Sequence, residues 1–269
     1  MRWLRLNKLS LNAGKTELIF FHSTRHPLNY EKISIKINGK KLEPVDFIKY
    51  LGMYIDKYLS WDVHIRELSK KLGRANGILS KLRYNAPINT CMNVYYATFY
   101  SYLTYRCNVW GLTSETNLNK IEVLQRKCLR IMSFAPYNSP SHEKFLELKL
   151  LKVRDIIKME QLKLTYNFHI HNLPEDLSRL FVLSSDMDKR NFKLNRDRDH
   201  FLYLSKTRTS TYGLNSVSYH YAKLWNQTFK HGIEISSDPK KVVPFKKIKN
   251  VHHFKRILKK HFLHTYSQQ

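Results

Sequence analysis

Residues 65–82 read IRELSKKLGRANGILSKL, and this stretch decides the fold class. Its apolar side chains recur at gaps of three and four residues, which is the period of an amphipathic α-helix. They are Ile65, Leu68, Leu72, Ala75, Leu79 and Leu82. On a helical wheel Lys70, Arg74 and Lys81 fall together on the opposite side. The stretch therefore predicts a helix with one apolar face and one basic face, which Pro87 ends.

Two further helices are expected downstream. Residues from about 90 to 109 are apolar and aromatic all round, which is typical of a helix buried at the centre of a bundle. From about 115 to 134 the helical period returns, and Arg126, Lys127 and Arg130 project outward. The inward side chains are Leu118, Ile121, Leu124, Cys128 and Ile131. Residues 61–135 therefore predict a helical bundle.

The first 60 residues carry strand signals instead. Residues 18–21 form a short apolar run, and three isoleucines at alternate positions in 33–37 precede Asn38-Gly39, a strong hairpin turn signal. Residues 47–55 are another strand candidate, which Gly52 interrupts, and such a glycine indicates a bulge or a close backbone approach. The expected fold is α+β and mostly α, with its β-hairpin before residue 60.

A second helical region, basic in character, is expected over 136–269. Its helical period continues to about His171, and residues 184–212 are polar and charged, which predicts a long loop. The chain carries no acid after Asp238 but nine lysines and arginines. In the expected last helix three apolar residues pack (Phe254, Leu258, Phe262), while three cations face out (Arg256, Lys259, Lys260).

The charge of the chain points to a polyanionic partner. Its 269 residues hold 47 Lys and Arg against 21 Asp and Glu, a net charge of +26. An excess of this size favours DNA or RNA, and an apolar content of 42% excludes global disorder. The three cysteines are far apart and odd in number, which predicts reduced core thiols in an intracellular protein.

Targeting signals are not expected in this sequence. Met1 and its neighbours are not followed by the apolar core of a signal peptide, which argues against secretion. The most membrane-like window, residues 89–110, contains three asparagines and five tyrosines. Such a window suits a buried protein helix better than a membrane span.

The sequence offers no recognisable catalytic or metal site. There is no Asp-Asp pair, and the acids of 186–188 and 197–199 lie among basic residues in the expected loop. Gly14-Lys15-Thr16 lacks the upstream glycine of a phosphate-binding loop, and no GxSxG nucleophile motif occurs. The paired histidines have no carboxylate or thiol at ligand spacing. Composition and spacing alone predict a basic, helix-rich nucleic-acid-binding protein.

The motifs Leu9-Ser10-Leu11-Asn12, Lys15-Thr16 and Tyr50-Leu51-Gly52 occur in this order along the chain. Taken together they resemble segments of the reverse transcriptases of non-LTR (LINE-type, jockey-like) retrotransposons. Leu9-Ser10-Leu11-Asn12 followed by Lys15-Thr16 is similar to the stretch after that family's catalytic Tyr-x-Asp-Asp strand. Tyr50-Leu51-Gly52 resembles its primer-grip hairpin, and Leu124-Gln125-Arg126-Lys127 resembles a thumb helix. The likeness covers nearly the whole chain, and the order and spacing of the motifs are more specific than any one of them.

The resemblance implies a division of the chain into three parts. Residues 1–60 would be the end of a polymerase palm, 61–135 its thumb and 136–269 its C-terminal region. The parent enzyme would carry out RNA-directed DNA synthesis with Mg²⁺, and its metal-binding aspartates would precede Met1. We therefore expect a truncated polymerase that grips template–primer nucleic acid but has no catalytic residue, cofactor or metal ligand of its own.

The resemblance also implies roles for single residues. Lys15 would lie behind the nucleotide site, and the turn Tyr50-Leu51-Gly52 would press on the terminal phosphate of the primer. A surface lysine and an ordinary hairpin are the alternatives. Exposed cations of the two thumb helices would follow the phosphates of the duplex, with a solvated basic face as the alternative; these are Lys70, Arg74, Lys81, Arg126, Lys127 and Arg130. The cations of the last helix, Arg256, Lys259 and Lys260, would hold RNA or target DNA, or form a solubilising tail.

Two other functions remain open from the sequence. The chain would serve as a stand-alone RNA-binding protein with the same basic faces, or as a helical scaffold for an acidic protein partner. Under the leading hypothesis its partners are RNA and DNA, with no membrane and no obligate protein partner. Its expected location is intracellular, in the nucleus, the cytoplasm or both.

Overall fold

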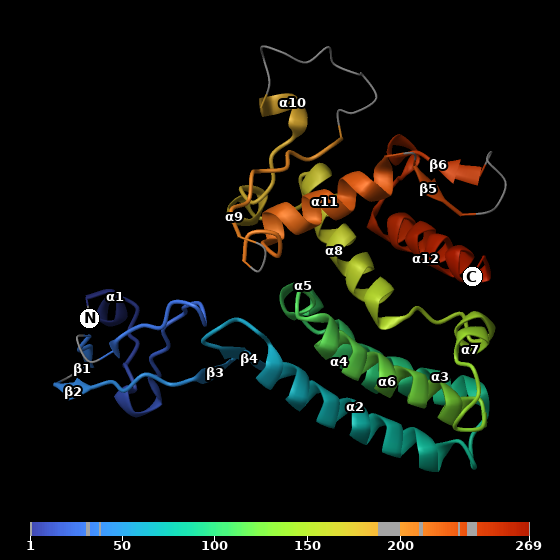
Figure 1. Cartoon of the computed structure of the whole chain (residues 1–269), viewed down its shortest axis with the longest axis horizontal. Helices are drawn as coiled ribbons and strands as arrows, with labels where there is room; N and C mark the ends of the chain where they lie inside the picture. Colours follow the sequence, from blue (N-terminus) through green and yellow to red (C-terminus); the bar gives the residue numbers. More distant parts are fainter. Residues whose placement is uncertain are drawn as a thin grey trace.

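The computed structural model describes residues 2–30, 33–37, 39–187, 200–209, 212–230, 232–235 and 241–268. Helices dominate these ranges, and the strands form three small two-stranded sheets. The expected α+β, mostly α fold class is confirmed. Residues 2–60 lie at one end, and the helices α2 to α6 follow; the C-terminal helices lie alongside this group, above it in Figure 1.

The long helix α2 (Asp62–Leu82) packs along α6 (Glu115–Met132). The predicted apolar stripe of α2 is buried except for Leu82, which is half-buried, and Ile65, Leu72 and Leu79 are fully buried. On α6, Ile121 and Cys128 are fully buried, whereas Leu124 and Ile131 are half-buried beside α2. Both helices thus form where the period of three and four predicts them.

The prediction of a single buried helix over residues 90–109 is wrong. The chain forms α3 (Ile88–Val94), a π-helical segment (Tyr95–Tyr100), α4 (Ser101–Thr104) and, after a break, α5 (Cys107–Trp110). Three hydroxyl side chains bond back to carbonyls four residues earlier, which loosens helices. These segments pack on α2 and α8 only over part of their circumference, so several aromatic residues are exposed.

The N-terminal 60 residues contain little regular structure. After α1 (Arg2–Leu6) and a 3₁₀ turn (Ala13–Lys15), β1 (Lys36–Ile37) pairs with β2 (Lys40–Lys41). This places a hairpin where it was expected, with Gly39 in its turn; Asn38 lies outside the described residues. Only a single bridge from Leu18 to Pro44 forms at 18–21. The apolar run there is not a strand, because Pro44 has no N–H to extend a ladder.

A second hairpin follows, made of β3 (Phe47–Tyr50) and β4 (Met53–Asp56). Its two turn residues, Leu51 and Gly52, have φ of 46° and 84°. Positive φ at both positions is the requirement of a type I′ turn, which matches the twist of paired strands. The glycine that interrupts the strand pattern of 47–55 therefore makes a hairpin turn rather than a bulge.

The C-terminal half is built on α8 (Val153–His169), which contacts α6, α11 (Val217–Phe229) and α12 (Val251–Ser267). Aromatic rings fill the space between these helices: Tyr166 stacks on Phe254 with centroids 4.5 Å apart, and Trp225 lies 4.2 Å from Phe229. Phe254 and Phe262 are buried on α12, as the sequence predicts.

Short elements complete this half. They are α7 (His142–Glu147), α9 (Glu175–Ser178), α10 (Ser184–Met187), β5 (Ile233–Glu234) paired with β6 (Val242–Val243), and a 3₁₀ turn (Phe245–Lys247). Of the long loop expected at 184–212, residues 188–199 and 210–211 lie outside the described part of the chain. The expected loop acids at 188, 197 and 199 fall in that gap.

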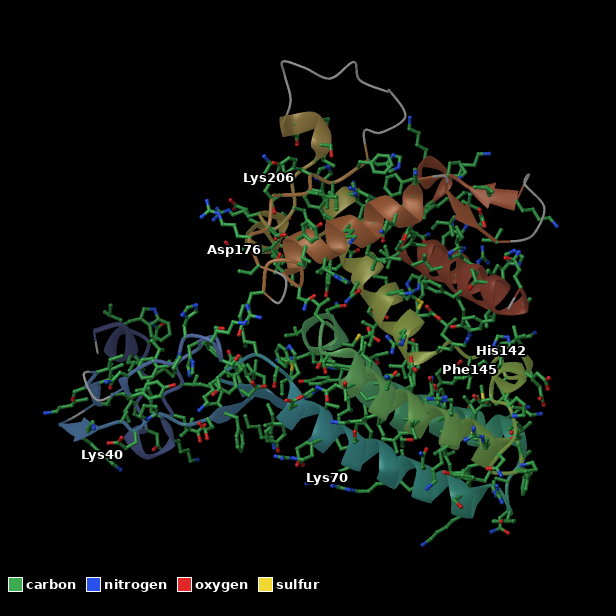
Figure 2. All side chains as sticks on the ribbon, in the orientation of Figure 1. Lys40, Lys70, His142, Phe145, Asp176 and Lys206 are labelled. Carbon is green, nitrogen blue, oxygen red and sulfur yellow. The ribbon has the colours of Figure 1, made fainter. Side chains whose placement is uncertain are left out.

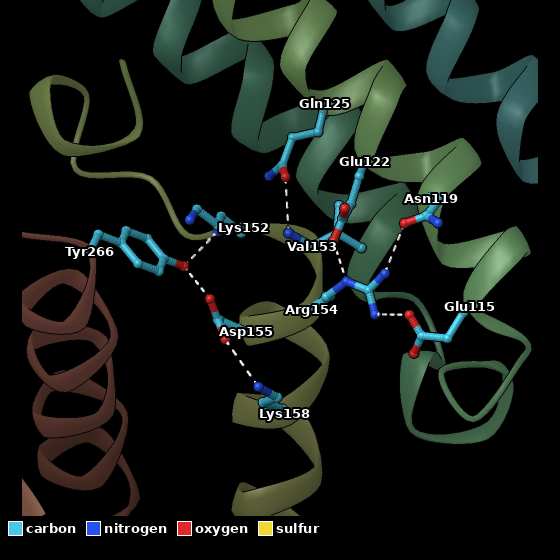
Figure 3. Close-up of polar contacts among 10 residues, drawn as sticks. All are labelled: Glu115, Asn119, Glu122, Gln125, Lys152, Val153, Arg154, Asp155, Lys158 and Tyr266. Atoms are coloured by element: carbon cyan, nitrogen blue, oxygen red, sulfur yellow. Dashed lines mark hydrogen bonds and ion pairs between the residues drawn. The ribbon is translucent and has the colours of Figure 1, made fainter. Parts of the chain in front are cut away.

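Polar contacts join α6 to the start of α8 (Figure 3). The buried amide of Gln125 donates to the carbonyl of Leu151 at 2.8 Å and accepts from the N–H of Val153 at 2.9 Å. Nearby, Arg154 forms ion pairs with Glu115 and Glu122 of α6. On the other side of α8, the Tyr266 hydroxyl of α12 donates to the Asp155 carboxylate and accepts from the N–H of Lys152.

The three cysteines are buried and unpaired, as expected. Burial raises the pKa of the Cys107 thiol to about 12 and also raises that of Cys128. Both are therefore protonated, inert thiols at neutral pH. Within the described ranges, no helix combines the length and apolarity that a membrane span requires.

Three helices end in the same backbone motif without a glycine. Phe134, Lys149 and His171 have φ between 51° and 53°, and each lies two positions after the last residue of its helix, α6, α7 or α8. In each case the next N–H bonds a carbonyl five residues back, as in Asn172 to Asn167 at 2.8 Å. This is the position that glycine usually fills, because a Cβ disfavours the left-handed conformation.

We expect the substitution His171→Gly to stabilise the protein by about 1 kcal/mol, since the exposed residue loses only its left-handed strain. Urea unfolding measures the difference. The control Lys158→Gly places the same residue in the middle of α8 and should destabilise by about 1 kcal/mol. A loss of stability in His171→Gly would contradict the assigned backbone conformation.

Candidate nucleic-acid interface

The β3–β4 turn is fixed to the helices by one side chain. The hydroxyl of Tyr105, in the break between α4 and α5, donates to the carbonyl of Leu51 at 2.7 Å. The Tyr105 ring also lies 3.5 Å from the place where a Cβ on Gly52 would stand. Tyr50 and Leu51 themselves are more than half exposed, at 57% and 58%. The turn is therefore fixed on the side that faces Tyr105, whereas the side chains of Tyr50 and Leu51 are accessible to solvent.

The base of the hairpin is fixed as well. The buried carboxylate of Asp56 accepts from the backbone N–H groups of Tyr58, Ser60 and Trp61, at 2.8 to 3.1 Å. These bonds order the turn that leads from β4 into α2. Because a carboxylate that accepts several N–H bonds is satisfied without a cation, Asp56 is a structural anchor rather than a free acid.

A cavity of about 370 Å³ lies between the hairpin turn, α2 and α4. We call it the hairpin groove; it is lined by Gly52, Tyr54, His64, Glu67, Leu68, Lys71, Ser101, Tyr102 and Tyr105. The ammonium of Lys71 lies 5.7 Å from the centre of the Tyr102 ring, and the guanidinium of Arg106 lies 5.3 Å from that of Tyr105. The groove therefore combines tyrosine rings with cations.

His64 forms part of the wall of the groove and is uncharged. It is only 6% exposed, and its ring lies against Trp110. Burial, with the positive charge of Lys71 nearby, lowers the pKa of His64 to about 4. Its Nδ1 accepts a long bond of 3.5 Å from the N–H of Tyr54, and its Nε2 has no partner among the described residues.

The predicted cations of α2 form an exposed stripe beside this groove. We call Lys70, Arg74 and Lys81 the α2 stripe; all three are exposed, and Lys70 projects from the outer edge of the helix in Figure 2. Lys70 pairs with Glu67 at 2.7 Å, while no ion pair of Arg74 or Lys81 occurs in the described ranges. Residues 68–114 contain no Asp or Glu at all. Glu67 is the one acid among the residues that line the groove, so positive charge predominates on this side of the helical group.

The cations of α6 are arranged differently from the expectation. Arg126 and Arg130 are half-buried, and only Lys127 is exposed. Arg126 lies in a cavity of about 200 Å³ with Glu122, and Arg130 donates to the carbonyl of Ser139 at 3.1 Å. The prediction that all three project outward as one face is wrong, because residues 133–145 fold back over this side of α6.

These α6 cations also lie apart from the α2 stripe. Asn76 of α2 donates to the Leu124 carbonyl of α6 at 3.0 Å, so this side of α2 faces α6. Arg74 precedes Asn76 by two residues, which places it on nearly the opposite side of a helix with 3.6 residues per turn. The two predicted thumb-like faces therefore do not form one surface.

The remaining predicted site residues lie elsewhere. Lys15 is exposed at the end of a 3₁₀ turn that Asn12 caps. On α12, Arg256 and Lys260 are exposed, but Lys259 is half-buried. Burial, followed by the charges of Lys255 and Lys149, lowers the pKa of Lys259. The expectation that all three α12 cations face out is thus wrong for Lys259, whose stem packs against neighbouring elements.

Sequence reasoning missed the aromatic half of the groove. Tyr102 and Tyr105 were assigned to the inside of a continuous helix, whereas they are 41% and 47% exposed. Lys71 was also not predicted as a site residue, because it lies at the edge of the basic face rather than in its centre. The acid-free run of residues 68–114 is the signal that would have drawn attention to this side.

Sequence comparison connects the chain to transposon polymerases. It is 28% identical over 181 residues to "RNA-directed DNA polymerase from mobile element jockey" of Drosophila funebris and 27% identical over 177 residues to the protein of that name in Drosophila melanogaster. These matches cover 66% and 62% of this chain. It is also 23% identical over 162 residues, 58% of this chain, to "Probable RNA-directed DNA polymerase from transposon X-element" of Drosophila melanogaster.

The similarity is confined to a part of each relative. The chain spans 19% of the length of the two jockey proteins and 17% of the X-element protein. No protein-family model and no solved structure matches it. The predicted resemblance to a region of jockey-like non-LTR retrotransposon polymerases is nevertheless confirmed by these relatives.

We expect Tyr105→Phe to loosen the β3–β4 turn, because it removes the hydroxyl that bonds the Leu51 carbonyl. A neutral hydrogen bond contributes about 1 kcal/mol, so amides of the hairpin should exchange with solvent about fivefold faster. Hydrogen–deuterium exchange measures this. Tyr102→Phe is the matched control, since within the described ranges its hydroxyl makes no hydrogen bond to the hairpin; equal effects of the two variants would refute the anchoring role.

Acid should destabilise the fold through its buried histidines. The pKa of His64 lies at about 4 in the folded protein against an ordinary value of 6.5, so the unfolded chain binds the proton first. Stability should therefore fall as the pH drops from 6.5 towards 4, by up to about 1.4 kcal/mol per pH unit for this residue.

Urea unfolding between pH 7 and pH 4.5 tests this expectation. His64→Phe should lose stability less steeply than the unmodified protein, whereas His26→Phe, at an exposed position, should follow it closely. If the stability of His64→Phe fell with decreasing pH as steeply as that of the unmodified protein, His64 would not be held neutral by burial.

Proposed function

We propose that this chain is a nucleic-acid-holding part of a jockey-type RNA-directed DNA polymerase, and that its hairpin groove and α2 stripe hold a template–primer duplex by its phosphates. The proposal rests above all on the Tyr105–Leu51 bond, which joins the hairpin turn to the helices beside the stripe. In this assignment residues 1–60 belong to the palm, 61–135 to the thumb and 136–269 to the C-terminal region.

The α2 stripe suits a regular polyanion. From Lys70 to Lys81 it covers about 17 Å of helix at 1.5 Å per residue, which is long enough to follow several phosphates. Cations in such a row hold a duplex without reading its sequence, since a hybrid duplex is recognised by its backbone and shape. Residues 68–114 contain no carboxylate that would repel the phosphates on this side.

The hairpin groove supplies a different kind of contact at one end of the stripe. Lys71 offers a point charge, and the rings of Tyr102 and Tyr105 offer flat apolar surfaces beside it. His64 stays neutral at physiological pH and so adds no charge. This combination suits the end of a strand, where a phosphate and a sugar or base are presented together.

The chemical step of the polymerase is assigned to no residue of this chain. Within the described ranges no three His, Cys, Asp or Glu side chains gather as a metal-binding set. The proposed contribution of these residues is to bind and orient the duplex.

Salt-dependent binding of an RNA–DNA hybrid tests the proposal. The triple variant Lys70→Gln, Arg74→Gln, Lys81→Gln should bind roughly tenfold more weakly at 0.1 M salt. The slope of log affinity against log salt should fall by up to about 3, because each lost phosphate contact removes about 0.9. Fluorescence anisotropy with a labelled duplex measures both.

A matched control removes three charges from another side of the protein. Lys144, Lys158 and Lys163 each pair with an acid three residues away, and their triple Gln variant should change the salt slope much less. Equal losses in the two triple variants would show that net charge alone drives binding. Binding of an acidic protein but not of the duplex would favour the scaffold function instead.

A further inference from the structure

Exposed aromatic rings gather at the end of α2 that lies away from the hairpin. Tyr84, Phe134 and Tyr137 are 67%, 57% and 81% exposed, and Arg83 and Arg130 lie among them. We call these five residues the tip cluster. It lies where α2 and α6 both end, about 30 Å along α2 from Asp62.

Two arginines hold these rings in place. The guanidinium of Arg83 lies 4.7 Å from the centre of the Tyr84 ring and 4.5 Å from that of Phe134. It also donates to the Tyr84 hydroxyl at 2.7 Å and to the Ile131 carbonyl at 3.1 Å, which fixes it to the end of α6. The exposed rings are thus positioned by contacts behind them.

The second arginine acts in the same way on the other ring. Arg130 donates to the Ser139 carbonyl at 3.1 Å, and its guanidinium lies 5.8 Å from the centre of the Tyr137 ring. Tyr84 and Phe134 meet edge to face, with centroids 5.6 Å apart. The cluster therefore presents flat apolar surfaces to solvent on a fixed basic support.

The position of Phe134 is not explained by folding. With φ of 52° it occupies the left-handed residue at the end of α6, where glycine is favoured and a bulky side chain is rare. More than half of its ring is exposed, so it contributes little to the core. Lys149 and His171 occupy the same position at two other helix ends, but of the three only Phe134 places a large apolar ring there, and that residue is more than half exposed to solvent.

The positive charge around the tip cluster favours a negatively charged partner. Both segments that build it, residues 68–114 and 123–142, contain no Asp or Glu. A polyanion with flat, apolar groups complements this surface, and unpaired nucleotides provide both the phosphates and the bases. Stacking on aromatic rings is possible with any base, so no sequence preference is needed.

We propose that the tip cluster binds unpaired nucleotides of single-stranded nucleic acid by stacking their bases on Tyr84, Phe134 and Tyr137. This goes beyond the duplex-holding function, which uses the α2 stripe and the opposite end of α2. A paired duplex keeps its bases stacked inside and cannot use these rings. The two sites therefore differ in the strand state that they accept.

The double variant Phe134→Gly, Tyr137→Ser tests the proposal without endangering the fold. Glycine suits the left-handed conformation of residue 134, and Tyr137 is almost fully exposed. Binding of a labelled 12-nucleotide oligouridylate should weaken by roughly 5- to 100-fold. Binding of a blunt RNA–DNA hybrid should stay within about twofold, since no phosphate-contacting cation is removed.

The control His171→Gly makes the same backbone substitution at the end of α8 and removes an exposed ring there. It should leave oligouridylate binding unchanged. Unweakened oligouridylate binding by the double variant overturns the proposal, as does an equal loss for oligouridylate and hybrid. A selective loss of poly-glutamate binding would overturn it in favour of an acidic protein partner. The duplex-binding proposal is tested separately, by the binding of the RNA–DNA hybrid to the triple variant of the α2 stripe.

Discussion

The amide of Gln125 connects three parts of the chain that lie far apart in sequence. It donates to the Leu151 carbonyl and to the Tyr95 hydroxyl, and it accepts from the N–H of Val153. All of its hydrogen-bonding groups but one lone pair are thereby used in a buried place, where an unpaired group costs about 1–3 kcal/mol. Since α8 carries α11 and α12, the position of the C-terminal half depends on this residue.

The arrangement gives the two ends of α2 different surroundings. One end meets the hairpin groove through the Tyr105–Leu51 bond, and the other carries Arg83 and Tyr84 of the tip cluster. The α2 stripe lies between them on the same helix. A nucleic acid that is paired over one stretch and unpaired beyond it would therefore find both kinds of contact along a single straight element.

Much of the fold was predictable, and the interface much less so. The periods of α2 and α6 follow from local sequence, because apolar spacing is a local constraint. The turn at Leu51-Gly52 was expected only from the family resemblance, since the strand pattern of 47–55 by itself indicated a bulge or a close backbone approach. The break at Arg106 does not follow from local sequence, since it depends on packing against α2 and α8. The exposure of Tyr102 and Tyr105 followed from that break, and the burial of Arg126 depended on residues that fold back from farther along the chain.

The buried carboxylate of Asp56 has a mechanical consequence. Its three bonds to the N–H groups of Tyr58, Ser60 and Trp61 fix the connection between β4 and the first turn of α2. Thr113 and Asn117 brace the same junction, through the Ser60 carbonyl and the Asp62 carboxylate. The orientation of the hairpin is therefore tied to that of α2 at its base, while Tyr105 fixes its turn to the break between α4 and α5.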